Sequence, residues 1–400
     1  MNKKRVLFLH NEFPSGGAER VTVDIADYIS ERGFDIYVLA REIRDWSLPN
    51  MTLLELPDKM SVNSKENADA IIDILQELQI DIFVLPVQTL SYLSHIRSNT
   101  HCKIIFALHG VPFWEIASDL YTKKKRVWSS PFKRLGWILV TYPKTMWFKR
   151  YHKRLLSDYI RVYSQVDAYT VLCEEYKQVL IEKMKLSPSE NRIYVVPNSE
   201  KSAETVNFNK KKQILYVGRM SYEDKRIDRL INIWDMIYEK VPDWEFILVG
   251  DGEERESLQQ MAQKKKLPRI SFAGHSDHVE KYYRDASVLC LVSTFEGWGL
   301  CLTEAQANGV VPIAFDCSAG VHYILSPSGQ NGILVTPYNL EEYARLLVEL
   351  LTESEKLKMM RQNVIRKSME YAPDVIGDKW LRIFDSLLSS LGKCNKMENN

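Results

Sequence analysis

The stretch from Ser293 to Asp316 holds two acidic side chains that could bind a hydroxylated ligand. Glu296 and Glu304 are separated by seven residues. The first of them is followed directly by Gly297, Trp298, Gly299 and Leu300. Carboxylates accept hydrogen bonds from hydroxyl groups but repel phosphate. These two acids are therefore suited to the hydroxyls of a sugar rather than to an anion.

The elements around the two glutamates place them at one edge of a sheet. Residues 287–292 form an apolar run typical of a buried strand, residues 302–308 predict a helix, and residues 310–315 predict the next strand. Ligands bind at the carboxyl edge of open parallel sheets, where glycines and a helix N-terminus bring backbone amides close to an anion. Hydroxyl-binding acids beside an anion site predict a sugar nucleotide.

A second pair of charged residues, Arg219 and Lys225, could bind the diphosphate of such a ligand. Arg219 lies just beyond the apolar run 214–217, and Lys225 precedes a helical pattern at 227–238. An arginine fork and a lysine point charge in one loop can clamp a diphosphate and oppose the charge that develops as a nucleoside diphosphate departs. Alternatively, the two bases are ordinary surface residues.

Other predicted strand ends carry glycine or histidine. Gly16 and Gly17 join the first strand to the first helix, where they either present amides to a diphosphate or an acceptor, or simply form a turn. The pattern GxGxxG is absent, which disfavours a nicotinamide or flavin site. His109 follows the strand at 103–108 and is either catalytic or structural. Two further turns, one of which could hold the nucleotide base, contain Gly250, Gly274 and His275.

The sequence carries no metal-binding signature. It contains no Asp-x-Asp pair that could hold a divalent ion against a diphosphate, and its eight histidines show no ligand spacing. We therefore expect no metal and no other cofactor, with Arg219 and Lys225 taking over the electrostatic role of the metal.

Length and composition are typical of a two-domain soluble protein. The 400 residues exceed one comfortable core, and the 45% apolar and 26% charged fractions are ordinary for globular chains. Six cysteines without a CxxC pair indicate reduced thiols in a cytoplasmic protein. The first apolar run is too short for a signal peptide, and no run reaches the roughly 18 residues of a membrane span.

Strand and helix patterns alternate along nearly the whole chain, which predicts parallel sheets with helices on both faces. The polar stretch 199–212 has no apolar period and is interpreted as a linker. We expect two doubly wound domains with a cleft between them, residues 1–198 and 213–370, followed by a C-terminal helix at 371–390.

Residues 120–157 interrupt this alternation with eleven Lys and Arg residues, no acid and eight interleaved aromatic residues. Basic side chains attract anionic lipid headgroups, and amphipathic rings settle at the lipid–water boundary, so the segment predicts a peripheral membrane contact. A solvated basic insertion and a nucleic-acid surface are the alternatives, although no nucleic-acid motif accompanies the charge. The expected membrane contacts are Lys123, Lys124, Lys125, Arg126, Trp128, Trp137, Trp147, Lys149 and Arg150.

Taken in order, these motifs resemble the family-4 retaining glycosyltransferases of the GT-B fold. The resemblance rests on the Gly16-Gly17 loop, His109-Gly110, Arg219 with Lys225, the double-glutamate block and Asn331-Gly-Ile-Leu-Val335, and extends to about residue 385. It implies two Rossmann-like domains facing each other across a cleft, with residues 1–198 binding the acceptor and residues 213–370 the nucleotide sugar. It also implies that the helix at 371–390 crosses back to the first domain. It also implies an enzyme of bacterial polysaccharide or glycolipid assembly that transfers a sugar from a nucleoside diphosphate, most simply UDP.

The resemblance further implies a role for each motif. Arg219 and Lys225 would bind the diphosphate, helped by the backbone at Gly17 and at Gly297–Leu300. Glu304 would hold the ribose, Glu296 the transferred sugar, and His109 would contact that sugar near the reacting carbon. Family members retain anomeric configuration, and front-face attack is the favoured proposal for their mechanism.

The sequence departs from the family pattern at two places, and the acceptor stays open. Arg226 stands where relatives often have glycine, and Gly320 is followed by Val321, His322 and Tyr323 rather than by a glutamate three residues on. The basic aromatic segment resembles those of relatives that act on lipid-linked acceptors, which favours a polyprenyl-diphosphate-linked glycan at the inner face of the cell membrane. A soluble sugar acceptor, and a catalytically silent protein that recruits a partner to the membrane, are the alternatives.

Overall fold

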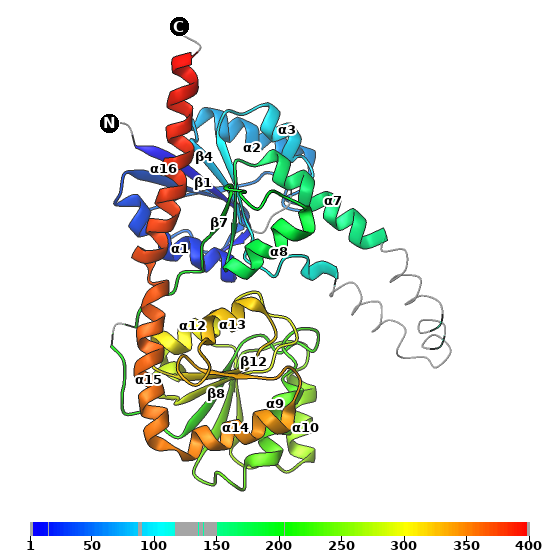
Figure 1. Ribbon diagram of the computed structural model, residues 1–400, viewed down its shortest axis with the longest axis vertical. Coiled ribbons are helices and arrows are strands. Elements are labelled where there is room, and N and C mark those ends of the chain that lie inside the picture. Colours follow the sequence, from blue (N-terminus) through cyan, green and yellow to red (C-terminus); the bar gives the residue numbers. More distant parts are fainter. Residues whose placement is uncertain are drawn as a thin grey trace. The chain divides into compact units, whose positions relative to one another are not determined.

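The computed structural model describes residues 3–14, 16–86, 90–116, 135, 139, 150–203 and 205–397. The chain divides into two compact units, one formed by residues 1–197 with 377–400 and the other by residues 198–376 (Figure 1). Of the expected membrane contacts, only the backbone of Arg150 is described. The others lie outside the described residues: Lys123, Lys124, Lys125, Arg126, Trp128, Trp137, Trp147 and Lys149.

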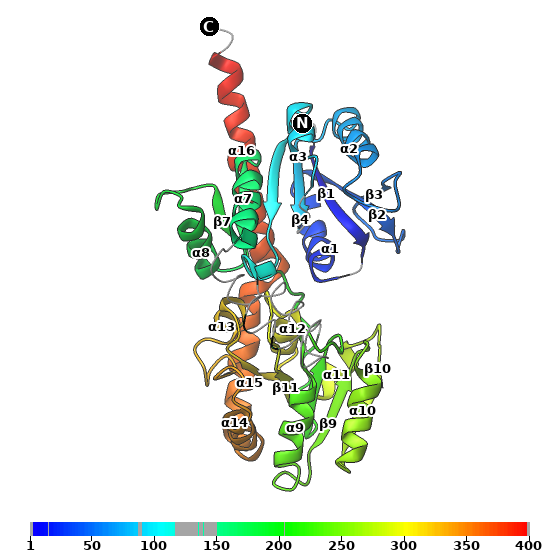
Figure 2. The same cartoon turned by 90° about the vertical axis from the view of Figure 1, so that its right-hand side faces the viewer.

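The described part of the first unit is built on a seven-stranded sheet in which each strand pair is parallel. Its strand order is β3-β2-β1-β4-β5-β6-β7, and Figure 2 shows β2 and β3 at one edge and β7 at the other. The strands are β1 (Lys4–Phe13), β2 (Phe34–Ile43), β3 (Thr52–Glu55), β4 (Ile82–Pro86), β5 (Lys103–Ala107), β6 (Ala168–Val171) and β7 (Ile193–Val195). Every residue of β4 and of β6 is buried, as expected for strands covered on both faces.

Helices connect these parallel strands. They are α1 (Gly17–Ser30), α2 (Lys65–Glu77), α3 (Leu93–Ser98), α7 (Arg150–Gln165) and α8 (Glu174–Met184). Ser64 caps α2, because its side chain accepts a hydrogen bond from the Asn67 amide. The last helix of the chain, α16 (Pro373–Met397), contributes its residues from Gly377 onward to this unit. There Trp380 and Phe384 pack against Phe8 of β1 and Phe34 of β2.

The second unit contains, in its described residues, a six-stranded parallel sheet with the order β10-β9-β8-β11-β12-β13. The strands are β8 (Gln213–Val217), β9 (Glu245–Val249), β10 (Ile270–Gly274), β11 (Val288–Leu291), β12 (Val311–Phe315) and β13 (Ile333–Val335). The central strands β11 and β12 are buried throughout.

Helices cover both faces of this sheet. Figure 1 shows α9, α10 and α14 below it and α12 and α13 above it, in agreement with the contacts of α9 with α10 and α14 and of α12 with α13 and α15. The helices are α9 (Asp228–Ile237), α10 (Arg255–Lys264), α11 (Glu280–Asp285), α12 (Leu300–Ala307), α13 (Ala319–Leu325), α14 (Leu340–Thr352) and α15 (Ser354–Ser368), followed by the 3-10 turn η2 (Met369–Tyr371). No described helix of either unit combines the length and apolar composition needed to cross a membrane.

Two parallel-sheet, Rossmann-like units confirm the predicted fold class. The strand ranges predicted from the sequence, 103–108, 214–217, 287–292 and 310–315, agree with β5, β8, β11 and β12 to within one residue at each end. The edge strands β3 and β13 were missed, because both are short and the residues of β3 are exposed or half-buried.

The polar stretch 199–212, which was interpreted as a linker, begins with two buried residues. Asn198, Ser199 and Glu200 are 4% exposed or less, and the Glu200 amide donates to the Tyr371 carbonyl. The Thr303 hydroxyl also donates to the Glu200 carboxylate at 3.2 Å. Polar residues can be buried when they are hydrogen-bonded, and an apolar period does not reveal such a segment.

Candidate active site

The carboxyl ends of four neighbouring strands in the second unit carry most of the predicted donor-binding residues. Arg219 follows β8, Gly250 follows β9, Gly274 ends β10, and Glu296 lies in the loop after β11. These strands are adjacent in the order β10-β9-β8-β11. The Gly250 amide donates to the Gly274 carbonyl at 2.8 Å. His275 lies beyond this edge with its side chain 73% exposed, and it contacts Asp277.

The central feature of this edge is an ion pair between Lys225 and Glu296. The lysine ammonium donates to Glu296 Oε2 at 2.5 Å, and the two side chains are 19% and 12% exposed. The Ser293 hydroxyl bonds the same carboxylate oxygen at 3.4 Å. Burial lowers the pKa of Lys225, but the negative charge of Glu296 more than offsets this, so the pKa is raised above its ordinary value. The lysine therefore stays charged throughout the physiological pH range.

Arg219 lies in the same loop but is oriented toward solvent. Its side chain is 70% exposed, and its guanidinium contacts the Asp224 carboxylate at 3.0 Å. Asp224 also accepts a hydrogen bond from Ser221, and its carbonyl accepts one from the Thr294 amide at 2.6 Å. The loop that bears both bases is thereby fixed to the loop that bears Glu296.

The N-terminus of α12 lies directly beyond Glu296. Gly299 caps the helix with a φ of 85°, a left-handed conformation that favours glycine. A Cβ atom at Gly320 would lie 2.2 Å from the Gly297 carbonyl oxygen, so the first turn of α13 approaches this loop as closely as glycine allows. The Trp298 side chain is 2% exposed and packs on Tyr323 and Tyr371. Only the backbone of Trp298 is therefore available to a ligand.

The second predicted acid, Glu304, is 9% exposed within α12. Tyr283 of α11 donates its hydroxyl to Glu304 Oε2 at 2.5 Å. Burial, reinforced by the nearby negative charge, raises the pKa of Tyr283 well above its ordinary value, so the phenol remains a hydrogen-bond donor. The position of Glu304 is thus set by a residue that the sequence did not single out.

The first unit holds its own cluster, around Gly16, Gly17 and His109. The carboxylate of Glu19 lies at the N-terminus of α1, where a Cβ on Gly16 would be 2.6 Å from Glu19 Oε2. Glu19 Oε1 lies 3.5 Å from Nδ1 of the buried His10, whose Nε2 is 3.0 Å from the Thr22 hydroxyl. Burial raises the pKa of Glu19, but His10, its own amide and the nearby His109 outweigh it and lower the pKa overall.

Replacing Glu19 by glutamine should therefore lower stability in a pH-dependent way. Because the folded-state pKa is below the ordinary value of 4.5, the stabilisation is present above that value and is lost as pH falls through the lower folded pKa. We expect a loss of about 1 kcal/mol at pH 7, as for a carboxylate in the first turn of a helix. The difference in Tm from wild type should shrink as pH falls below 4.5 and close once the pH is below the lowered pKa of folded Glu19.

A matched control for this prediction is Glu31→Gln at the other end of the same helix. The Glu31 side chain is 77% exposed, and its contact with Arg32 at 3.8 Å is a surface ion pair that contributes little to stability. Its replacement should therefore change Tm little at any pH. A Glu19→Gln difference that is constant from pH 7 to pH 3.5 would exclude an ionised Glu19 as its cause.

Sequence reasoning found the exposed and loop residues of these clusters but missed their buried partners. His10 lies inside β1 among buried apolar residues, and Tyr283 is the one buried residue of α11. The single available signal for Glu19 was its position two residues after the Gly-Gly pair. Among the described residues, no three His, Cys, Asp or Glu side chains are grouped as they would be around a metal ion.

Comparison with known proteins identifies the two units. Residues 15–199 match the model described as Glycosyltransferase Family 4, and residues 198–367 match that described as Glycosyl transferases group 1. An uncharacterized glycosyltransferase of Haemophilus influenzae is 26% identical over 392 residues, which cover 94% of this chain and 99% of that protein.

Solved structures share the fold. A lipopolysaccharide outer core galactosyltransferase, WaaB, superposes with a TM-score of 0.67 at 17% identity, covering 97% of this chain and 99% of its own. HepE of Anabaena, solved with UDP and glucose, gives a TM-score of 0.71 at 16% identity and covers 96% of this chain and 100% of its own. The chain therefore combines a Glycosyltransferase Family 4 domain, over residues 15–199, with a group 1 glycosyltransferase domain, over residues 198–367, and shares the GT-B fold of these solved structures.

Proposed function

We propose that this protein is a retaining, metal-independent glycosyltransferase that moves a sugar from a UDP-sugar to a hydroxyl of a lipid-linked glycan. The observation that carries the proposal is the buried pair of Lys225 and Glu296 beside Arg219 and the N-terminus of α12. The loop after β8 offers two positive charges to a diphosphate, and the N-terminus of α12 offers backbone amides. Glu296, between β11 and α12, accepts hydrogen bonds from a sugar.

The proposed roles follow from these contacts. Arg219 and Lys225 bind the diphosphate and stabilise the charge that develops on the leaving group. Lys225 and Ser293 both bond Oε2 of Glu296, which orients this carboxylate toward the transferred sugar. Tyr283 positions Glu304 for the ribose. His109 acts in the first unit on the donor sugar, with Glu19 as its charged neighbour.

Two similar proteins support the choice of donor and acceptor. The structure of HepE contains UDP and glucose, and WaaB is named as a galactosyltransferase of the lipopolysaccharide outer core. A carboxylate pair for hydroxyls and a cationic loop for a diphosphate suit a UDP-linked hexose or N-acetylhexosamine equally well.

A screen of nucleotide sugars tests the donor assignment. At 100 times its Kd, a ligand stabilises the protein that binds it by about 2.7 kcal/mol, so the true donor should raise Tm measurably. The same donor should release nucleoside diphosphate when extracted lipid-linked glycan is added, with or without EDTA, and the product should keep the anomeric configuration. Absence of release with every donor would support a silent binding protein, and transfer only to free sugars would favour the soluble acceptor.

The membrane part of the proposal predicts binding to anionic vesicles. Basic residues near an anionic surface contribute about 1 kcal/mol each, so neutralising Lys123–Arg126 together with Lys149, Arg150, Lys153 and Arg154 should lower partitioning by at least 100-fold. Lys153 and Arg154 lie exposed on α7. Neutralising the exposed run Lys264–Lys266 of the second unit is the control. Unchanged sedimentation of the eight-residue variant with vesicles would contradict the membrane contact.

A further inference from the structure

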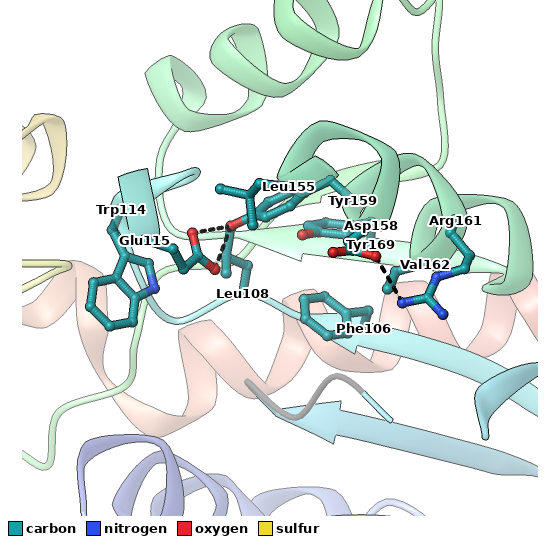
Figure 3. Close-up of a pocket in the computed structure, with 10 residues that line it drawn as sticks. All are labelled: Phe106, Leu108, Trp114, Glu115, Leu155, Asp158, Tyr159, Arg161, Val162 and Tyr169. Carbon is teal, nitrogen blue, oxygen red and sulfur yellow. Dashed lines mark hydrogen bonds and ion pairs between the residues drawn. The ribbon is translucent and has the colours of Figure 1, made fainter. Parts of the chain in front are cut away.

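The first unit contains a cavity of about 300 Å³ that none of the predicted site residues lines. It lies between the carboxyl end of β5 and one face of α7 (Figure 3). Phe106, Leu108, Val162 and Tyr169 form apolar walls, each 6% exposed or less. This is the size and composition of a small-molecule site, in which a few polar groups orient a ligand within apolar walls.

The polar groups of this cavity are a carboxyl and a phenol in contact. The Tyr159 hydroxyl lies 3.3 and 3.2 Å from the two oxygens of Glu115. It also accepts a hydrogen bond from the Phe113 amide at 3.0 Å, which fixes its direction. Burial raises the pKa of Glu115 above its ordinary value, and this outweighs the hydrogen bonds from its own backbone and from Tyr159, which lower it.

The rim of the cavity carries an exposed aromatic ring. Trp114 is 45% exposed, and Figure 3 shows it beside Glu115 at one end of the cavity, with Asp158 and Arg161 at the other. A Cβ on Gly110 would lie 3.7 Å from the Trp114 ring, so this ring borders the His109-Gly110 turn. A ligand that stacks on Trp114 therefore lies next to the loop of His109.

These features narrow the class of ligand. Phosphate and other anions would meet the Glu115 carboxyl, and Arg161, the one cation among the described residues that line the cavity, is already paired with Asp158 at 3.0 Å. An alkyl chain would leave the carboxyl and the phenol without a ligand partner. A pyranose ring satisfies both requirements, because its C–H face packs on aromatic walls and its hydroxyls both donate and accept.

We infer that the cavity between β5 and α7 binds an uncharged sugar ring of the acceptor, with Trp114 stacking on it and Glu115 and Tyr159 bonding its hydroxyls. The inference rests on the proposed function, because the sugar is identified as part of an acceptor. Binding of the sugar to the cavity can nevertheless be measured without transfer. Sugar binding to the cavity requires neither a donor nor turnover, so the two proposals can fail separately.

Saturation-transfer NMR with simple probes tests the inference. The probes are the methyl glycosides of glucose, galactose, N-acetylglucosamine and rhamnose, with decanol and choline as the apolar and cationic alternatives. We expect at least one glycoside to give signals in wild type, and Trp114→Ala to weaken its binding by at least 10-fold. Glu115→Gln and Tyr159→Phe should each weaken it by about 3- to 10-fold, because a charged or neutral hydrogen bond is altered rather than a whole wall removed.

Matched controls make the result specific to the cavity. Trp46→Ala removes a tryptophan of the same unit that is more exposed than Trp114 (59% against 45%), and Glu77→Gln removes an exposed acid of α2. Both should bind the glycoside as wild type does. Circular dichroism and Tm identify any variant that does not fold, in which case the two conservative variants, Glu115→Gln and Tyr159→Phe, decide.

Three results would overturn the inference. They are no glycoside signal in wild type, a signal that persists in Trp114→Ala and Glu115→Gln, or Trp114-dependent binding of decanol or choline but of no glycoside. Nucleoside diphosphate release without glycoside binding would support the proposed function and contradict a role of the cavity in it. Trp114-dependent glycoside binding without nucleoside diphosphate release from any donor would support the sugar site in the cavity and contradict the proposed transfer.

Discussion

Replacing Lys225 by methionine should destabilise the second unit by about 3 kcal/mol and abolish sugar transfer. Methionine keeps the length and apolar part of the side chain but removes the charge that lies 2.5 Å from Glu296. The carboxylate is 12% exposed, and removing one partner of a buried ion pair typically costs 3–5 kcal/mol. The midpoint of urea unfolding measures the loss of stability, and an assay of nucleoside diphosphate release measures the loss of transfer.

The double variant Lys225→Met, Glu296→Gln separates stability from chemistry. With no charge left in the pair, at least half of the lost stability should return, whereas transfer should stay below 1% of the wild-type rate because both proposed ligand contacts are gone. Lys265→Met is the control, since its 2.6 Å pair with Asp235 is partly exposed and should cost less than about 1 kcal/mol. Wild-type stability of the single variant, or recovered transfer in the double variant, would contradict this account.

The fold was largely predictable because its central strands are continuous apolar runs. β4, β11 and β12 are buried along their whole length, so their sequences contain no competing polar signal. The edge strand β3 and the buried polar residues 198–200 could not be predicted from the sequence. β3 alternates little and lies at the sheet edge, and residues 198–200 are polar yet buried through hydrogen bonds that involve residues more than 100 positions away.

The residues of the candidate site could be named from the sequence, but the contacts between them could not. Lys225 and Glu296 were both named from the sequence, for different parts of the ligand, whereas the structure pairs them directly across 71 positions. Trp298 was expected beside the donor, but its ring belongs to the core of the second unit. Buried partners such as Tyr283 are indistinguishable in sequence from ordinary core residues, because their role comes only from what they face.

Arg219→Ala should reduce turnover by 10²–10³-fold, or about 2.7–4 kcal/mol, without changing stability. The side chain is 70% exposed, and its contact with Asp224 is a surface pair, which contributes little to folding. Its proposed function appears only when a diphosphate departs, so its loss should reduce kcat more than it raises KM for the donor. Arg219→Lys should recover part of the rate, because a point charge remains but the planar fork that grips two phosphate oxygens does not.

Arg345→Ala is the matched control for this loss, since Arg345 is 66% exposed, lies in the same unit and pairs with Glu349 at 3.7 Å. It should leave kcat, KM and the unfolding midpoint at wild-type values. If Arg219→Ala kept kcat within threefold of wild type, the leaving diphosphate would have to be stabilised by Lys225 and the α12 amides alone. A loss of stability in Arg219→Ala would instead mean that the Asp224 contact holds the loop together, and that the arginine acts on the site through the fold.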